Sequence, residues 1–268
     1  MNRKTDILTI GYLTFLILLF LSGSISGILS EVLYLLAFVL PFFAVMLQAK
    51  EKGRYTDLLS ISKENISFAL PLIAPTVSLI IIVSFLTSLL IYAVTGKTNS
   101  VSLGDSFVLA LLSHAMMPAV FEEMLFRYLP MRLLSSHSKR GAIIISAIFF
   151  SLVHHNLFSI PYAFLAGVIF MAIDIACDSV VPSILIHFIN NALSVSIVLY
   201  ADNHAFAPTV YLIIGVLTLI SVCYVLRRRR VYAEALACAF DKGEGVKFTV
   251  GMLLFALLTL TLAVASLI

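Results

Sequence analysis

Long apolar stretches separated by short polar segments follow one another along nearly the whole chain. A helix needs about 20 residues, with a range of about 17–25, to cross the hydrocarbon core of a bilayer. The stretches of that length cover residues 7–29, 31–49, 68–95, 106–130, 141–157, 160–177, 180–200, 208–226 and 249–268. The pattern predicts an all-α fold, a polytopic bundle of transmembrane helices with an eight-helix core and a ninth, C-terminal span.

The composition agrees with a membrane protein. Hydrophobic residues make up 61% of the 268 residues and charged residues 12%, whereas soluble domains hold about 45–50% apolar and about 25% charged residues. No internal repeat or linker divides the chain, so we predict one integral membrane domain over residues 1–268. The three cysteines show neither CxxC spacing nor even pairing, which argues against a zinc ribbon or a disulfide framework.

The basic residues predict the orientation in the membrane. With the N-terminus inside, 15 of the 17 Lys and Arg fall in inside segments, while Lys97 lies outside and Arg127 lies within a span. Positive charge gathers on the cytoplasmic side of membrane proteins. We therefore expect a cytoplasmic N-terminus, and the compact loops suggest a prokaryotic plasma membrane.

Residues 227–247 form a predicted cytoplasmic basic segment, which begins with four consecutive arginines, Arg227–Arg230. These arginines either anchor the topology or bind anionic lipid headgroups at about 1 kcal/mol per basic residue. We expect no nucleic-acid partner.

The first polar cluster lies within the fourth span and holds Glu122, Glu123 and Arg127. A charge in the middle of a transmembrane helix costs about 2.5–3.5 kcal/mol, so such residues suggest a function. Glu123 and Arg127 have the i,i+4 order that favours a helical ion pair. Neighbouring helix positions point about 100° apart, which leaves Glu122 on another face as a candidate general base. The alternative is a buried ion-pair lock between helices.

The second cluster, Phe150 and His154, ends the fifth span. The apolar run before His154 spans only about 18 Å of helix, so this imidazole stays within the membrane and needs a polar partner or a wet cavity. His154 is therefore a candidate base or metal ligand, and Phe150, one turn earlier, either walls the site or packs. His114 of the fourth span either faces the same cavity or is a packed imidazole.

The third cluster, His187 and Asn191, lies on one face of the seventh span at i,i+4. Both side chains can donate hydrogen bonds, as an oxyanion hole requires, although polar contact between helices is the alternative. His187 lies roughly 10 Å and His154 roughly 20 Å from the inner ends of their helices. We expect a broken or strongly tilted fifth helix to bring them together.

With these clusters in place, residues 106–195, a predicted catalytic core of spans four to seven, resemble the CPBP family. This family contains type II CAAX prenyl endopeptidases and bacteriocin-immunity-type membrane proteins. The resemblance rests on the sequences EEMLFR at 122–127, FSLVH at 150–154 and HFINN at 187–191. One departure is Cys177-Asp178, where many relatives carry a Thr-Gly-like turn. We interpret Asp174 and Asp178 as carboxylates that face water near the inner end of span six.

The resemblance implies an eight-helix bundle with a catalytic cavity open toward the cytosol. It implies that Glu122 and His154 activate a water molecule and that His187 and Asn191 hold the oxyanion. It also implies that Glu123 and Arg127 support the site, and we add Phe150 as a supporting residue from its position one turn before His154.

The leading hypothesis is a glutamate-dependent intramembrane endopeptidase that cleaves a membrane-associated peptide or protein, prenylated or not, without a required cofactor. In a variant, Glu122, His154 and His187 bind Zn²⁺, but no HExxH helix supports it. The alternative is a non-enzymatic scaffold or regulator that binds a peptide or a sensor kinase or gives bacteriocin self-immunity. A proton-coupled transporter would show inverted repeats, and the sequence shows none.

Overall fold

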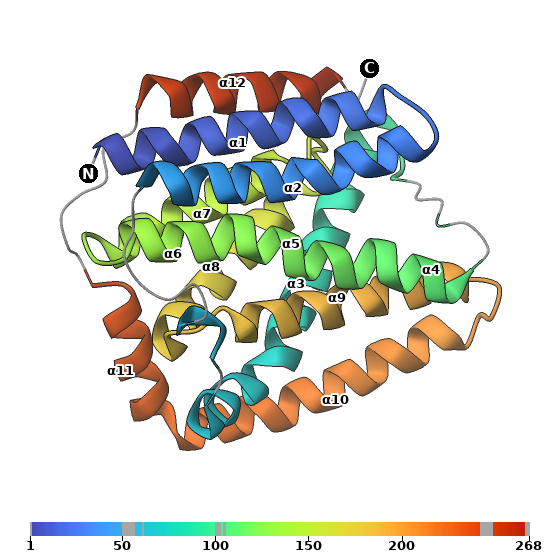
Figure 1. The fold of residues 1–268 in the computed structure, drawn as a ribbon. Helices are drawn as coiled ribbons and strands as arrows, with labels where there is room; N and C mark the ends of the chain where they lie inside the picture. Colours follow the sequence, from blue (N-terminus) through green and yellow to red (C-terminus); the bar gives the residue numbers. More distant parts are fainter. Residues whose placement is uncertain are drawn as a thin grey trace.

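A computed structural model describes residues 2–49, 57–60, 62–99, 103, 106–241 and 249–265. All regular structure in these residues is helical (Figure 1). The helices are α1 (Asn2–Gly23), α2 (Ile28–Ala49), η1 (Asp57–Leu59), α3 (Lys63–Thr95), α4 (Phe107–Leu111), η2 (Leu112–Met116), α5 (Met117–Glu123), η3 (Met124–Tyr128), α6 (Leu129–Leu134), α7 (Lys139–Leu152), α8 (Ile160–Cys177), α9 (Val181–Leu199), α10 (Phe206–Arg227), α11 (Arg229–Ala239) and α12 (Val250–Ala265). Each apolar stretch of the sequence has become a helix.

The predicted all-α membrane bundle is confirmed. In the described residues, seven helices are long and apolar enough to cross a membrane, and α7 and α12 are shorter, with 14 and 16 residues. Figure 1 shows α1, α2 and α12 side by side along one edge and α10 along the opposite edge. Because α12 contacts α1 and α7 at the edge of the bundle, the ninth span is an accessory to an eight-helix core.

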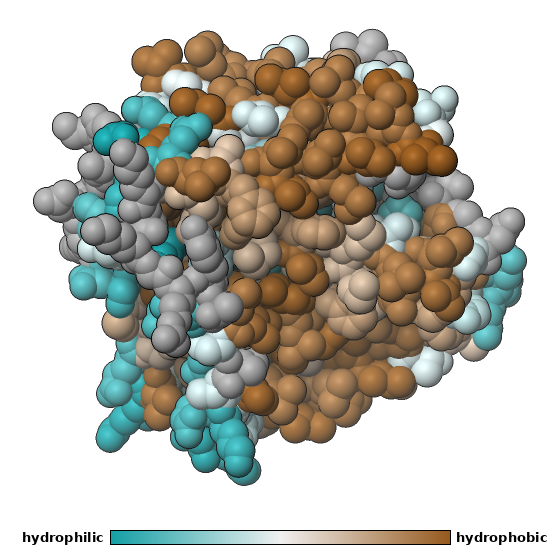
Figure 2. All heavy atoms as spheres, in the orientation of Figure 1, coloured by the Kyte–Doolittle hydropathy of each residue, from teal (hydrophilic) through white to brown (hydrophobic). Residues whose placement is uncertain are grey.

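The outer surface suits a lipid environment. Figure 2 shows a broad apolar face with hydrophilic side chains gathered at its ends, most densely beside α11. Large side chains such as Leu90, Leu219 and Leu257 are more than 60% exposed. Soluble monomers rarely expose apolar patches larger than a few hundred Å², so this surface faces lipid in an integral membrane protein.

The fourth span, residues 107–134, is one continuous helix with two π-helical turns. In the first turn, η2, the Met117 N–H donates to the Leu112 carbonyl five residues earlier, next to Pro118, which has no N–H to donate. The second turn, η3, follows Glu123 directly and includes Arg127. A π-turn holds one residue more than an α-turn and recurs at functional sites. It shifts the side-chain register on either side of the glutamate pair.

Helices α7 and α8 pack backbone to backbone. A Cβ atom added to Gly167 of α8 would lie 2.7 Å from the Cα atom of Ala147 in α7. Only glycine permits this approach, since any larger residue would have to push the two helices apart. The contact fixes α7, which ends in the second motif, against α8.

The turn between α8 and α9 contains a residue in a backbone conformation that favours glycine. Asp178 adopts the left-handed conformation, with φ of 49°, and glycine adopts this conformation without a steric penalty. Neighbouring segments hold the turn: the Asn65 amide donates to the Cys177 carbonyl at 2.7 Å, and the Val180 N–H donates to the Leu58 carbonyl at 2.9 Å.

Replacing Asp178 with glycine should therefore stabilise the protein. Asp178 is exposed, so the main effect is the release of left-handed strain, about 1 kcal/mol. We expect a higher thermal unfolding temperature for Asp178→Gly in detergent solution. Asp178→Ala serves as the control, because it removes the carboxylate and keeps the strain. A rise of equal size in both variants would contradict this explanation.

Candidate active site

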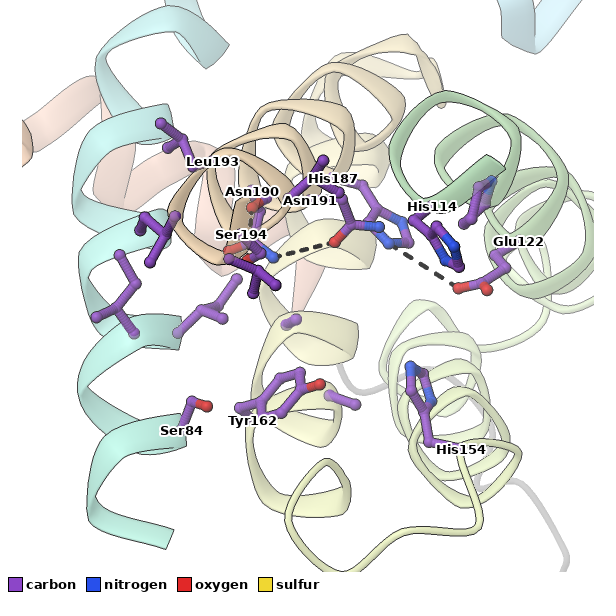
Figure 3. A pocket seen from close by; sticks show the side chains of 18 of the residues that line it. Ser84, His114, Glu122, His154, Tyr162, His187, Asn190, Asn191, Leu193 and Ser194 are labelled. Carbon is purple, nitrogen blue, oxygen red and sulfur yellow. Dashed lines mark hydrogen bonds and ion pairs between the residues drawn. The ribbon is translucent and has the colours of Figure 1, made fainter. Parts of the chain in front are cut away.

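The three polar clusters of the sequence converge on one cavity of about 920 Å³ (Figure 3). Glu122 reaches it from the fourth span, Phe150 and His154 from α7 and the turn after it, and His187 and Asn191 from α9. Helices α2, α3, α8 and α10 also line it. The structure thus brings together residues that lie up to 69 positions apart in the sequence, from 122 to 191.

Glu123 connects the fourth span to α9. Its side chain and that of Arg127 are completely buried, with Glu123 Oε2 3.2 Å from Arg127 Nε. Its other oxygen, Oε1, lies 2.7 Å from His187 Nδ1. The ion pair predicted from the i,i+4 spacing is confirmed, and the hydrogen bond to His187 could not be read from spacing. Glu123 does not line the cavity and supports the site from behind.

The Arg127 guanidinium lies between two aromatic rings. Its Cζ atom is 3.9 Å from the centre of the Phe150 ring and 5.5 Å from that of Phe170. A desolvated guanidinium over an aromatic ring gains about 2 kcal/mol. Phe150 also contacts His154 and His187, with ring centres 5.1 and 5.8 Å apart. Phe150 is therefore the wall between the buried cation and both imidazoles.

Glu122 faces the cavity, as its position on another helix face predicted. Its side chain is 19% exposed, and its Oε2 lies 3.9 Å from His187 Nε2. It also lines a second, smaller cavity of about 160 Å³, together with His154 and side chains of α1 and α2. Two adjacent glutamates thus occupy different surroundings, one paired and sealed, the other open to the cavity.

His154 lies just beyond the end of α7 at Leu152. Its Nδ1 is 2.8 Å from the Phe150 carbonyl oxygen, and a carbonyl can only accept, so Nδ1 carries the hydrogen. On a neutral imidazole Nε2 then keeps a lone pair. The helix thus ends two residues before His154, whose side chain bonds back to the last turn of α7.

Asn191 is oriented by its neighbour. The Asn190 side-chain nitrogen donates to Asn191 Oδ1 at 3.2 Å, as Figure 3 shows. With its oxygen engaged in this way, the Asn191 NH₂ group is the part that can donate to a ligand. The side chains of Asn191 and His187 come from the same helix and point into the same space.

The cavity also has lining residues that the three motifs do not include. Tyr162 of α8 and Tyr34 of α2 both line it, and the Tyr162 hydroxyl donates to Ser159 Oγ at 3.1 Å. Tyrosines are common as anchors at the membrane interface, so nothing in the sequence pattern singled these two out. His114 lines the cavity too.

The interpretation of Asp174 as a water-facing carboxylate is wrong. Asp174 is completely buried, and its Oδ1 accepts a hydrogen bond from the Ser183 backbone N–H at 3.1 Å. The first turn of a helix has N–H groups without helical partners and carries partial positive charge. Asp174 therefore caps α9, the helix that bears His187 and Asn191. Asp178 is exposed, as expected.

The residues proposed as zinc ligands do not fit a metal ion in these positions. Among the residues that the structure describes, no group of three or more His, Cys, Asp or Glu side chains could hold one. We derive no chemical step through a metal.

Comparison with known families points the same way as the motifs. Residues 104–193 match the family model described as type II CAAX prenyl endopeptidase, Rce1-like. The match includes all three motifs and confirms the resemblance over this part of the chain. No curated protein and no solved structure matches. The match supports a membrane protease and does not extend to the roles of single residues.

Removing the Asp174 carboxylate should loosen the start of α9. We expect Asp174→Ala to lower the free energy of unfolding by about 0.5–2 kcal/mol, the usual range for a lost helix cap. Asp174→Asn keeps an oxygen acceptor for the Ser183 N–H and should lose much less. Thermal unfolding of the purified variants in detergent compares them. Equal losses in both variants would show that the cap is not the role of this side chain.

Proposed function

We propose that this protein is an intramembrane endopeptidase that hydrolyses a peptide bond in a membrane-associated peptide or protein. The observation that carries the proposal is the different environment of the two glutamates. Glu123 is buried and paired with Arg127 and His187, whereas Glu122 opens into a cavity that also holds His154 and Asn191. A buried ion-pair lock would seal both carboxylates away from the cavity, whereas Glu122 lines it.

In the proposed reaction, a water molecule lies between Glu122 and His154. The lone pair on His154 Nε2 orients the water by accepting one of its hydrogens, and the Glu122 carboxylate takes the other as a proton. The oxygen attacks the carbonyl carbon of the scissile peptide. Positioned proton transfer of this kind contributes about 10²–10⁴-fold to a rate.

Asn191 and His187 would stabilise the oxyanion that forms. Asn191 donates through its NH₂ group. Because His187 Nδ1 donates to Glu123, its Nε2 can donate only from the doubly protonated imidazolium. In the intermediate Glu122 holds the proton and is neutral, so the oxyanion and the Glu123 carboxylate balance the positive charges of His187 and Arg127. As the intermediate collapses, Glu122 returns the proton to the leaving nitrogen, and the products are a carboxylic acid and an amine.

The cavity lining and the four consecutive arginines suit two different partners, a peptide and a lipid. The cavity is lined by apolar side chains interspersed with serine and asparagine, which suits a peptide segment, prenylated or not. Arg227–Arg230 are exposed where α10 meets α11, and four basic side chains at the end of a span suit anionic lipid headgroups. The mechanism requires no cofactor.

Glu122→Gln should abolish cleavage. The amide keeps the size of the side chain and cannot accept the proton, so we expect turnover to fall by at least about 100-fold. Purified protein in detergent or liposomes is assayed on candidate membrane-associated peptides. Glu234→Gln is the matched control, because Glu234 is exposed on α11, away from the cavity.

Turnover by Glu122→Gln equal to that of the unmodified protein would refute the glutamate mechanism. A cellular phenotype that survives this substitution at normal protein levels would favour the scaffold or regulator. A chelator added to the same assay tests the metal: unchanged turnover agrees with the proposed mechanism, and loss that zinc restores contradicts it.

Asn191→Ala should slow the chemical step more than it weakens substrate binding. Loss of one oxyanion donor costs about 10²–10³-fold in kcat, so we expect a fall in kcat of that order with KM changed little. Steady-state kinetics on the same peptide measure both constants. A rise in KM with unchanged kcat would place Asn191 in substrate binding and remove it from the oxyanion hole.

A further inference from the structure

The two ends of the bundle differ in charge. We define the basic end by the N-terminal end of α1, the turn at residues 135–138 and Arg227–Arg230. The opposite end holds the segments that follow α3 and α9, including residues 96–99 and 200–205. In Figure 1 the N-terminus and α11 are both at the left, and the connection from α9 to α10 lies at the right.

The cavity lies toward the opposite end. On α3, α9 and α10, its lining residues gather in the half far from the arginines. They include Ser84 and Ser88 of α3, Ser194 and Val198 of α9, and Tyr211 of α10. The lining residues of the fourth span also lie at its middle or in the half far from the arginines: Ser113, His114, Pro118 and Glu122. His187 is the lining residue nearest the basic end on α9.

The basic end is closed by close packing. Below the cavity lies the buried layer of Glu123, Arg127 and Asp174, each completely buried. Beyond that layer, large side chains of the fourth span, α7 and α8 are at most 2% exposed: Leu129, Leu133, Leu134, Ile143, Ile145, Met171 and Ile173. Of the residues described, none beyond this layer lines the cavity.

We infer that the cavity opens on the membrane face opposite the basic end, and that its substrate is a polypeptide segment presented there. Because 15 of the 17 basic residues place the basic end in the cytoplasm, that face is the extracytoplasmic one. The substrate is then the extracytoplasmic portion of a membrane-associated peptide or protein, not a cytosolic C-terminal tail. This differs from the cytosol-facing cavity that the family resemblance implied.

The cavity wall on that side fits such an occupant. Hydroxyl and amide side chains alternate with apolar ones: Ser84, Ser88, Ser113, Asn190 and Ser194 stand among isoleucine, leucine and phenylalanine. Backbone polar groups at membrane depth need partners or water, and an extended peptide would find both along this wall. The identity of the occupant as substrate rests on the proposed function, whereas the direction of the opening rests on geometry and charge.

Thiol labelling tests the direction of the opening. In a background where Cys177, Cys223 and Cys238 are replaced by serine, Ser194→Cys and Ser88→Cys place a thiol in the cavity. Ser136→Cys places one in the exposed turn at the basic end. Intact cells are treated with a charged, membrane-impermeant maleimide, before or after permeabilisation. We expect the two cavity thiols to label equally in both conditions and the Ser136→Cys thiol to label only after permeabilisation.

Labelling of the cavity thiols only after permeabilisation would overturn the inference, as would labelling of Ser136→Cys in intact cells. Labelling does not require catalysis, so the result stands apart from the protease assay. If Glu122→Gln cleaves normally while the cavity thiols label from outside, the proposed function fails and the opening remains. The substrate class is tested with a peptide that the purified protein cleaves, added outside intact cells. This peptide should protect Ser194→Cys from the maleimide. Unchanged labelling would refute the proposed substrate class.

Discussion

The hydrogen bond between Glu123 and His187, together with the ion pair between Glu123 and Arg127, holds the site in its geometry. A charged group in the apolar interior is tolerated when it is paired and hydrogen-bonded, and removing one partner of such a pair is costly. Glu123 meets both conditions only while the fourth span and α9 keep their present register. The cost of unpairing therefore fixes the positions of the helices that carry Glu122 and Asn191.

The buried charges are supported by aromatic rings and a helix cap. Phe150 and Phe170 cover the Arg127 guanidinium, and Phe150 also touches both imidazoles. Asp174 secures the first turn of α9 from the neighbouring helix α8. These contacts restrict the rotamers of the groups that line the cavity, and preorganisation of this kind makes donors effective on a developing charge.

The same buried layer separates the two halves of the bundle. Below it the helices pack closely with large apolar side chains, and above it α3, α9 and α10 leave a cavity of about 920 Å³. A polar site within a membrane needs water or partners from one side. Placing the layer at the floor of the cavity gives Glu122 access to one membrane face and closes the other.

The sequence by itself determined the long apolar helices and the location of the candidate chemistry. Hydropathy and the 3.6-residue period are local properties, so the apolar stretches, the Glu123–Arg127 pair and the separate face of Glu122 followed from spacing alone. Only the tertiary structure decided which faces meet. The bond from Glu123 to His187 joins residues 64 positions apart, and the return of His154 to the Phe150 carbonyl depends on where α7 ends.

Asp174 shows the limit most clearly. A carboxylate near the end of an apolar helix suggests contact with water. In the structure this carboxylate is buried instead, because it accepts a hydrogen bond from an N–H group in the first turn of the next helix. Neither the place of Tyr162 in the cavity wall nor the direction of the cavity could be predicted, because both depend on how helices distant in sequence pack together. Local periodicity determines which side chains share a face of a helix. Packing between helices distant in sequence determines which partners those side chains contact.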